Sequence, residues 1–157
     1  MKLDHGSTID IVKVDLALSK PNKDFGRAFY LSDDRQQALE MAQFRAEFEE
    51  TEPVVNVYEF DESLFQEFRY RRFEAYTEDW AHFVYDHRTE PHSLTLHDYD
   101  IVYGPIANDR VGAQIARYKQ GYITFDEFLR RIQYIKGITF QYAFCTQRAI
   151  DKLQKIL

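Results

Sequence analysis

The chain has 157 residues, near the usual size of one domain, and 45% of them are hydrophobic and 16% aromatic. This composition excludes a disordered chain, and no apolar run approaches the roughly 18 residues that a membrane span needs. The formal net charge of -6 disfavours bulk attraction to phosphate backbones, although it leaves room for a local basic patch. We therefore expect one globular domain over residues 1–157.

Two further features bear on location. The N-terminus lacks the basic start and apolar middle of a secretory signal, and the one cysteine cannot form an internal disulfide. Both features predict a cytoplasmic protein that does not associate with membranes. Cys145 itself stands beside Phe144 in an apolar segment, which is typical of a buried structural thiol and not of a nucleophile.

The N-terminal half alternates short apolar runs with helical patterns. Asp33 and Gln36 resemble a capping box before a helix, and the β-branched and aromatic stretch after Pro53 favours a strand. In chain order, this half predicts a strand at 2–4, an irregular connection to 23, a strand at 28–31, a helix at 33–50, a strand at 54–60 and another strand or an extended arm at 64–73.

The C-terminal half predicts more helix. Thr77 caps one helix that ends near Arg88, and Thr124 with Glu127 forms a second capping box. The expected elements are helices at 77–88, 111–120, 124–134 and 147–157, with strands at 99–103 and 139–146. Because strands and helices do not alternate regularly, we expect an α+β domain with a largely antiparallel sheet and not a parallel βαβ fold.

Several familiar site patterns are absent or weak. The sequence has no GxxxxGK[ST], GxGxxG or GxSxG motif. His82, His87, His92 and His97 recur every five residues, but this step rotates about 140° on a helix and matches no zinc spacing, so we predict no metal site.

The segment "FRYRRF" at residues 68–73 interleaves three arginines with aromatic residues. Arg69, Arg71 and Arg72 are suited to contacting phosphate or single-stranded nucleic acid, which makes a nucleic-acid-binding protein one alternative function. A solvated strand face opposite a buried aromatic face explains the same alternation.

Five segments, taken in order, resemble one family. They are "HGS" at 5–7, "KDFGRAFYLS" at 23–32, "VYEFD" at 57–61, "YDIVYGPIAND" at 99–109 and "QYAFCT" at 141–146. Together they are similar to a bacterial family of unknown function that is grouped with the ADP-ribosyltransferases, and the resemblance covers nearly the whole chain. It implies an ADP-ribosyltransferase-like fold: a split antiparallel β-sheet core with flanking helices and a cleft between its halves.

The resemblance also implies a site for NAD as co-substrate. In the diphtheria-toxin branch, which includes the poly(ADP-ribose) polymerases, a His-Gly pair, a tyrosine and a glutamate form the NAD pocket. By analogy, His5 would hydrogen-bond a ribose of the adenosine half and the Gly6 backbone would pair with the nicotinamide carboxamide, with Ser7 beside them. Tyr30 would stack on the cationic nicotinamide ring. Gln141 stands where the family has its glutamate, so the implied catalytic residues are His5, Tyr30 and Gln141.

Gln141 is the main departure from the family pattern. An amide can hydrogen-bond a ribose, but it cannot act as a general base or supply a full negative charge. The chain would then transfer to a nucleophile activated by other means, use another carboxylate, or bind NAD without turnover. Asp100 and Asp109 are the candidate substitute carboxylates. Without the resemblance, His5 reads as a surface histidine, Tyr30 as a core aromatic and Gln141 as an exposed strand residue.

The function that this resemblance implies is mono-ADP-ribosyl transfer to a macromolecular acceptor, either a protein or a nucleic acid. A toxin-like enzyme of this kind also implies a neutralising partner protein. The alternative within the same fold is a non-catalytic module that binds NAD or another ligand.

Overall fold

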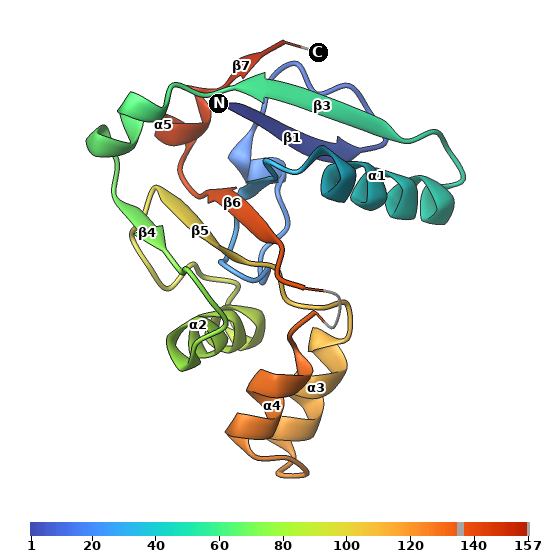
Figure 1. The fold of residues 1–157 in the computed structure, drawn as a ribbon, viewed down its shortest axis with the longest axis vertical. Coiled ribbons are helices and arrows are strands. Elements are labelled where there is room, and N and C mark those ends of the chain that lie inside the picture. The colour runs from blue at the N-terminus through green and yellow to red at the C-terminus, as the bar shows by residue number, and fades with distance from the viewer. Residues whose placement is uncertain (135–136, 157) are drawn as a thin grey trace.

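The computed structural model describes residues 1–134 and 137–156, and it contains two sheets and several helices (Figure 1). The first sheet has the antiparallel order β1-β3-β7, formed by Lys2–Ser7, Val54–Glu59 and Gln154–Lys155. The second sheet has the order β2-β6-β5-β4, formed by Phe29–Leu31, Phe140–Phe144, Ile101–Pro105 and Tyr70–Arg72. Its pairs are antiparallel except for β4 with β5, which is parallel. The α+β class predicted from the sequence is confirmed.

The helices lie around these sheets. They are α1 (Arg35–Glu49), α2 (Glu78–Thr89), α3 (Val111–Lys119), α4 (Phe125–Arg131) and the short α5 (Gln147–Ile150), with 3₁₀ turns at Leu16–Leu18 and Glu62–Glu67. Figure 1 shows α1 along the first sheet, α2 beyond the second sheet, and α3 and α4 as an adjacent pair at the far end of the molecule. The predicted caps Thr77 and Thr124 are confirmed, because their side chains accept hydrogen bonds from the backbone N–H groups of Trp80 and Glu127. The predicted cap at Asp33 is wrong by one residue, because the Asp34 side chain caps α1 by accepting from the N–H of Gln36.

The two faces of the second sheet bury two different clusters, because neighbouring residues of a strand point to opposite faces. Phe29, Tyr142 and Phe144 pack in a cluster with Leu3 and Tyr58 of the first sheet. The opposite face carries Val102 and Ala143, which belong to a cluster with Phe25 and with Trp80 of α2. The second sheet is therefore the middle layer of the fold, as Figure 1 shows.

Close packing fixes α1 against β1. The helix turns its small buried residues, Ala38, Ala42 and Ala46, toward the sheet. A Cβ atom on Gly6 would lie 2.1 Å from the carbonyl oxygen of Ala38 and 2.7 Å from the amide nitrogen of Ala42. Gly6 therefore has a packing role that is independent of any ligand, and its neighbour His5 points to the face away from α1.

One reciprocal backbone contact joins the two sheets. The N–H of Asp4 donates to the carbonyl oxygen of Ser32 at 2.7 Å, and the N–H of Ser32 donates to that of Asp4 at 2.8 Å. On its other edge β1 pairs with β3 along its whole length, including Asp4 with Val57, while β2 pairs with β6. Ser32 directly follows β2, so the strands that carry His5 and Tyr30 come together at this bridge, and each pairs with a different strand on its other edge.

Three element predictions need correction. The predicted helix at 147–157 is wrong beyond Ile150, because Gln154–Lys155 pairs with the edge of β3 and the N–H of Ile156 donates to the carbonyl oxygen of Val57. An open strand edge supplies backbone partners that a short terminal helix lacks. The extended segment at 64–73 is instead a 3₁₀ turn followed by β4, since the Asp61 side chain caps that turn. The helix that begins after Thr124 ends at Arg131 and not at 134. Within residues 1–134 and 137–156, no helix has the length and apolar character needed to cross a membrane.

We predict that Gly6→Ala destabilises the fold by about 1–3 kcal/mol, the usual cost of overpacking, because the new methyl group would collide with the α1 backbone. Urea denaturation measured by circular dichroism tests this. Gly112→Ala on α3 is the matched control: nothing lies within 4 Å of its added Cβ atom, so its stability should be unchanged or higher by up to about 1 kcal/mol. Equal stability of Gly6→Ala and wild type would contradict the close contact.

Candidate functional site

His5 extends the connection between the two sheets beyond the backbone pair. Its Nδ1 lies 2.6 Å from the carbonyl oxygen of Tyr30. A carbonyl oxygen only accepts, so Nδ1 carries the proton and Nε2 keeps a lone pair. The imidazole also packs on the ring of Phe29, with centroids 4.3 Å apart. His5 therefore has one fixed tautomer and lies beside the bridge that joins β1 to the end of β2.

The surroundings of His5 keep it neutral. Burial lowers its pKa from 6.5 to about 4, and the charge of Arg45 acts in the same direction, while the bond to the Tyr30 carbonyl opposes them. At neutral pH the Nε2 atom is consequently a hydrogen-bond acceptor. Such an atom can accept a bond from a hydroxyl group, which is what the predicted contact with a ribose requires.

The Tyr30 side chain points to the other face of its strand from Phe29. Its hydroxyl donates to the carbonyl oxygen of Gly26 at 2.7 Å and accepts from the N–H of Phe25 at 2.9 Å. Burial raises the pKa of Tyr30 well above its usual range. The structure therefore brings His5 to the backbone of Tyr30 and not to its ring. The stacking role of Tyr30 stays a prediction. The two hydrogen bonds of its hydroxyl group fix the orientation of the ring.

Gln141 lies on the same face of the second sheet as Tyr30. Tyr30 pairs with Ala143, two residues along β6, and alternate residues of a strand share a face. The Nε2 of Gln141 donates to the Oδ2 of Asp24 at 3.2 Å. Because Tyr30 also bonds to Phe25 and Gly26, residues 24–26 contact both of these predicted site residues.

Asp24 is the residue of this site that sequence reasoning missed. It is only 6% exposed, and its Oδ1 accepts from the Nε and an Nη of Arg88 at 2.8 and 2.5 Å. Its Oδ2 accepts from Gln141 and from the N–H of Ala107. In the sequence, an aspartate two residues before a glycine looks like an ordinary turn residue, and its partner Arg88 is 64 positions away, so no local signal revealed it.

Positive charge gathers near these groups. Burial lowers the pKa of Lys23, and the charges of Arg88, Lys20 and Arg45 lower it further, while Asp24 partly offsets them. Arg45 is also the charge that acts on His5. Arg45 is paired with Glu49 and Arg88 with Asp24, so two of these cations are already balanced by carboxylates, as Arg69 and Arg72 are.

Ser7 and the candidate substitute carboxylate Asp100 are buried, whereas the other candidate, Asp109, is exposed. Ser7 is 3% exposed, and its Oγ accepts from the N–H of Ile9 at 3.5 Å. Asp100 is also buried; burial raises its pKa, but bonds from the Arg69 N–H, Thr146 and Arg148 outweigh this and leave the pKa below its usual value. Asp100 therefore ties β5 to neighbouring segments. Asp109 is exposed in the turn before α3.

The spaced histidines have separate partners. His87 donates from Nδ1 to the Phe83 carbonyl oxygen and accepts at Nε2 from the Leu96 N–H, and His97 contacts the Phe25 carbonyl oxygen. His82 stacks on Phe125 at 4.0 Å. Within the described ranges, no group of three or more His, Cys, Asp and Glu side chains could hold a metal ion. Burial raises the pKa of Cys145 to about 12, which makes it a poor nucleophile at neutral pH.

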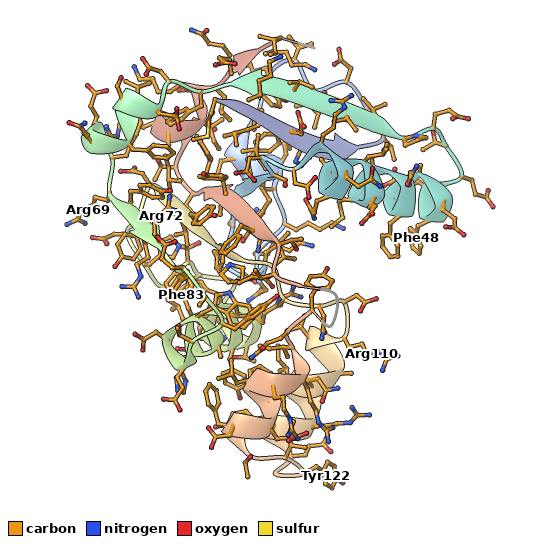
Figure 2. The ribbon with its side chains drawn as sticks, viewed as in Figure 1. Phe48, Arg69, Arg72, Phe83, Arg110 and Tyr122 are labelled. Carbon is orange, nitrogen blue, oxygen red and sulfur yellow. The ribbon has the colours of Figure 1, made fainter. Side chains whose placement is uncertain are left out.

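Two of the three clustered arginines are already paired with carboxylates. Arg69 contacts Asp98, and Arg72 donates to Glu74 at 2.7 Å. Figure 2 shows where Arg69 and Arg72 lie, near β4. Arg71 lies over the Phe73 ring at 4.5 Å, and its buried Nε has no hydrogen-bond partner in the part of the chain that the structure describes. It lines a hollow of about 330 Å³ beside α2, and a second hollow lies near Met1 and Asp151. Neither hollow is lined by His5, Tyr30 or Gln141.

Comparison with known proteins identifies the family. The family described as "Protein of unknown function (DUF3990)" matches residues 1–155, so the chain belongs to this family. Neither the curated proteins nor the solved structures gave a match. The expected membership of a family of unknown function is confirmed.

We predict that His5→Asn flattens the pH dependence of stability. The folded pKa of His5 is about 4 and its usual value is 6.5, so this contribution is fully present above pH 6.5 and is lost as the pH falls through 4. Asparagine keeps a donor for the Tyr30 carbonyl but does not titrate. Chemical denaturation between pH 7 and 4 should show the wild type losing about 3 kcal/mol more than His5→Asn.

The exposed His92 provides the control for this measurement, since His92→Asn should reproduce the wild-type profile. His87 and His97 also have pKa values lowered by burial, and they remain present in every variant of the comparison. Parallel profiles for His5→Asn and wild type would show that His5 is not buried in its neutral form.

Proposed function

We propose that the chain has an ADP-ribosyltransferase-like split sheet and transfers a single ADP-ribose from NAD to a macromolecular acceptor, releasing nicotinamide. The observation that carries the proposal is the neutral His5 ring, bonded to the Tyr30 carbonyl beside the bridge between Asp4 of β1 and Ser32 at the end of β2. The order of strands supports it, because β1 contacts β2 and β2 pairs with β6, the strand that carries Gln141.

The side chains near this point can be matched with the parts of a dinucleotide, with His5 on the Phe29 face of β2 and the Tyr30 ring on the opposite face. The Nε2 of His5 can accept from a ribose hydroxyl, and the exposed cation Lys23 suits a diphosphate. The partly exposed Tyr30 has its hydroxyl bonded at both donor and acceptor positions, which pre-orients the ring for stacking on a cationic pyridine.

The uncharged Gln141 limits which groups can accept the ADP-ribose. Cleaving the bond between nicotinamide and ribose builds positive charge on the sugar, and a site favours that state by position and by negative potential. Gln141 supplies hydrogen bonding without charge, and the nearby charge of Asp24 is shared with Arg88. We therefore expect transfer to an acceptor that needs no deprotonation by residue 141. A neutralising partner protein stays a prediction from the resemblance.

The non-catalytic alternative differs in one measurable property, since a binding module would take up NAD and release no nicotinamide. The nucleic-acid alternative gains no support from the geometry, because Arg69 and Arg72 are engaged by Asp98 and Glu74. The labelling experiment below tests the binding module against the transferase.

We predict that wild-type protein, incubated with labelled NAD and a cell lysate, transfers label to a protein or nucleic acid. His5→Asn keeps the bond to Tyr30 but lacks the Nε2 acceptor, so its labelling rate should fall by about tenfold or more, the loss of roughly one good hydrogen bond in the transition state. His92→Asn should label as wild type does.

Calorimetric titration with NAD completes this test. Binding by the wild type without label transfer or nicotinamide release would establish the binding module in place of the transferase. Equal labelling by His5→Asn and wild type would remove His5 from the site, and a wild type that neither binds nor consumes NAD would overturn the proposal.

A further inference from the structure

The Gln141 amide has one orientation that chemistry allows. The Asp24 carboxylate offers only acceptor atoms, so the Gln141 atom that contacts it at 3.2 Å must be the NH₂ group. The Oε1 of Gln141 is then directed away from Asp24, and no hydrogen bond to it is found in the described part of the chain. It is also not among the buried side-chain atoms that lack a partner, so it remains open to a ligand.

Asp24 is held rigidly enough to impose this orientation. Arg88 grips Oδ1 with two hydrogen bonds, and the Ala107 N–H contacts Oδ2. The carboxylate is buried, so water competes little for these bonds. A chain of contacts therefore runs from Arg88 on α2 through Asp24 to Gln141 on β6.

We propose that Arg88 and Asp24 are positioning residues that make Gln141 an obligate hydrogen-bond acceptor for a hydroxyl of the ribose attached to nicotinamide. This inference rests on the proposed function and deepens it. Without Asp24, the Gln141 side-chain amide could rotate by half a turn. Its NH₂ group would then face the ribose hydroxyl and donate a hydrogen bond to it in place of accepting one. With Asp24 in place, only the Oε1 lone pairs face the ligand.

The same contact explains why residue 141 is a glutamine. A glutamate there would set two carboxylates about 3 Å apart, a spacing at which like charges oppose joint ionisation. In this chain Asp24 supplies the negative charge, and the neutral Gln141 supplies the hydrogen-bond acceptor Oε1. Restoring Gln141→Glu alone is therefore expected to disturb the site, because the new carboxylate would repel Asp24.

The test uses calorimetric titration of the full chain with NAD and with NAD analogues that lack the 2′- or the 3′-hydroxyl of the nicotinamide ribose. Wild type should bind one of these analogues about tenfold more weakly than NAD, as expected for one hydrogen bond. Gln141→Met has similar size but no acceptor, so its affinities for NAD and that analogue should agree within about twofold. This ratio reports the hydroxyl contact, and a purely structural role would leave it unchanged. Gln120→Met, at an exposed glutamine, should keep the wild-type ratio.

A donor–acceptor exchange tests the part played by Asp24. Asp24→Asn and Gln141→Glu should each weaken NAD binding by about tenfold, through lost orientation and through charge repulsion. In the double variant, the new amide at position 24 donates to the new carboxylate at position 141, but the Ala107 N–H loses its acceptor and Arg88 its charged partner. NAD affinity should therefore recover by about threefold or more from the weaker single variant without reaching that of wild type. Thermal unfolding of every variant identifies any that fails to fold, and Gln141→Met still decides the hydroxyl contact in that case.

The outcomes separate this inference from the function on which it rests. A wild type that binds no NAD overturns both. A wild type that binds NAD while Gln141→Met still discriminates against the analogue overturns the acceptor role alone. Losses in the double variant that equal the product of the two single losses overturn the coupling between Asp24 and Gln141.

Discussion

The contact between β1 and β2 is the constraint on which the candidate site depends. Asp4 and Ser32 exchange two backbone hydrogen bonds there, and the His5 ring adds a third bond to the next part of β2. Close packing of α1 on Gly6 leaves the opposite face of β1 for His5. One short contact thus sets both the direction of the histidine and its tautomer, because a carbonyl oxygen can only accept.

Residues 24–26 provide the second constraint. They cover one face of the second sheet, where they hold the Tyr30 hydroxyl from one side and the Gln141 amide from the other. The buried charge of Asp24 is stable there because Arg88 reaches it from α2. A buried carboxylate without such a partner would be costly, so the position of α2 and the orientation of Gln141 depend on each other.

Sequence reasoning succeeded where the deciding interaction is local. Thr77 and Thr124 were recognised as caps because a cap bonds to an N–H only three residues away. The same reasoning failed at the C-terminus, where Gln154–Lys155 pairs with β3, about a hundred residues earlier in the chain. It proposed His5, Tyr30 and Gln141 as candidate site residues through the resemblance of whole segments, and this stays a prediction. It did not single out Asp24, because a turn aspartate looks alike whether or not an arginine reaches it.

The sequence by itself determined the α+β class, most helices and strands, and the family to which the chain belongs, since each of these follows from short-range patterns or from ordered segments. Only the tertiary structure decided which face of β2 carries the Tyr30 ring and which atom of Gln141 meets Asp24. Those features depend on strand register and on partners far apart in the chain, and a shift of one residue in register would turn each side chain to the opposite face.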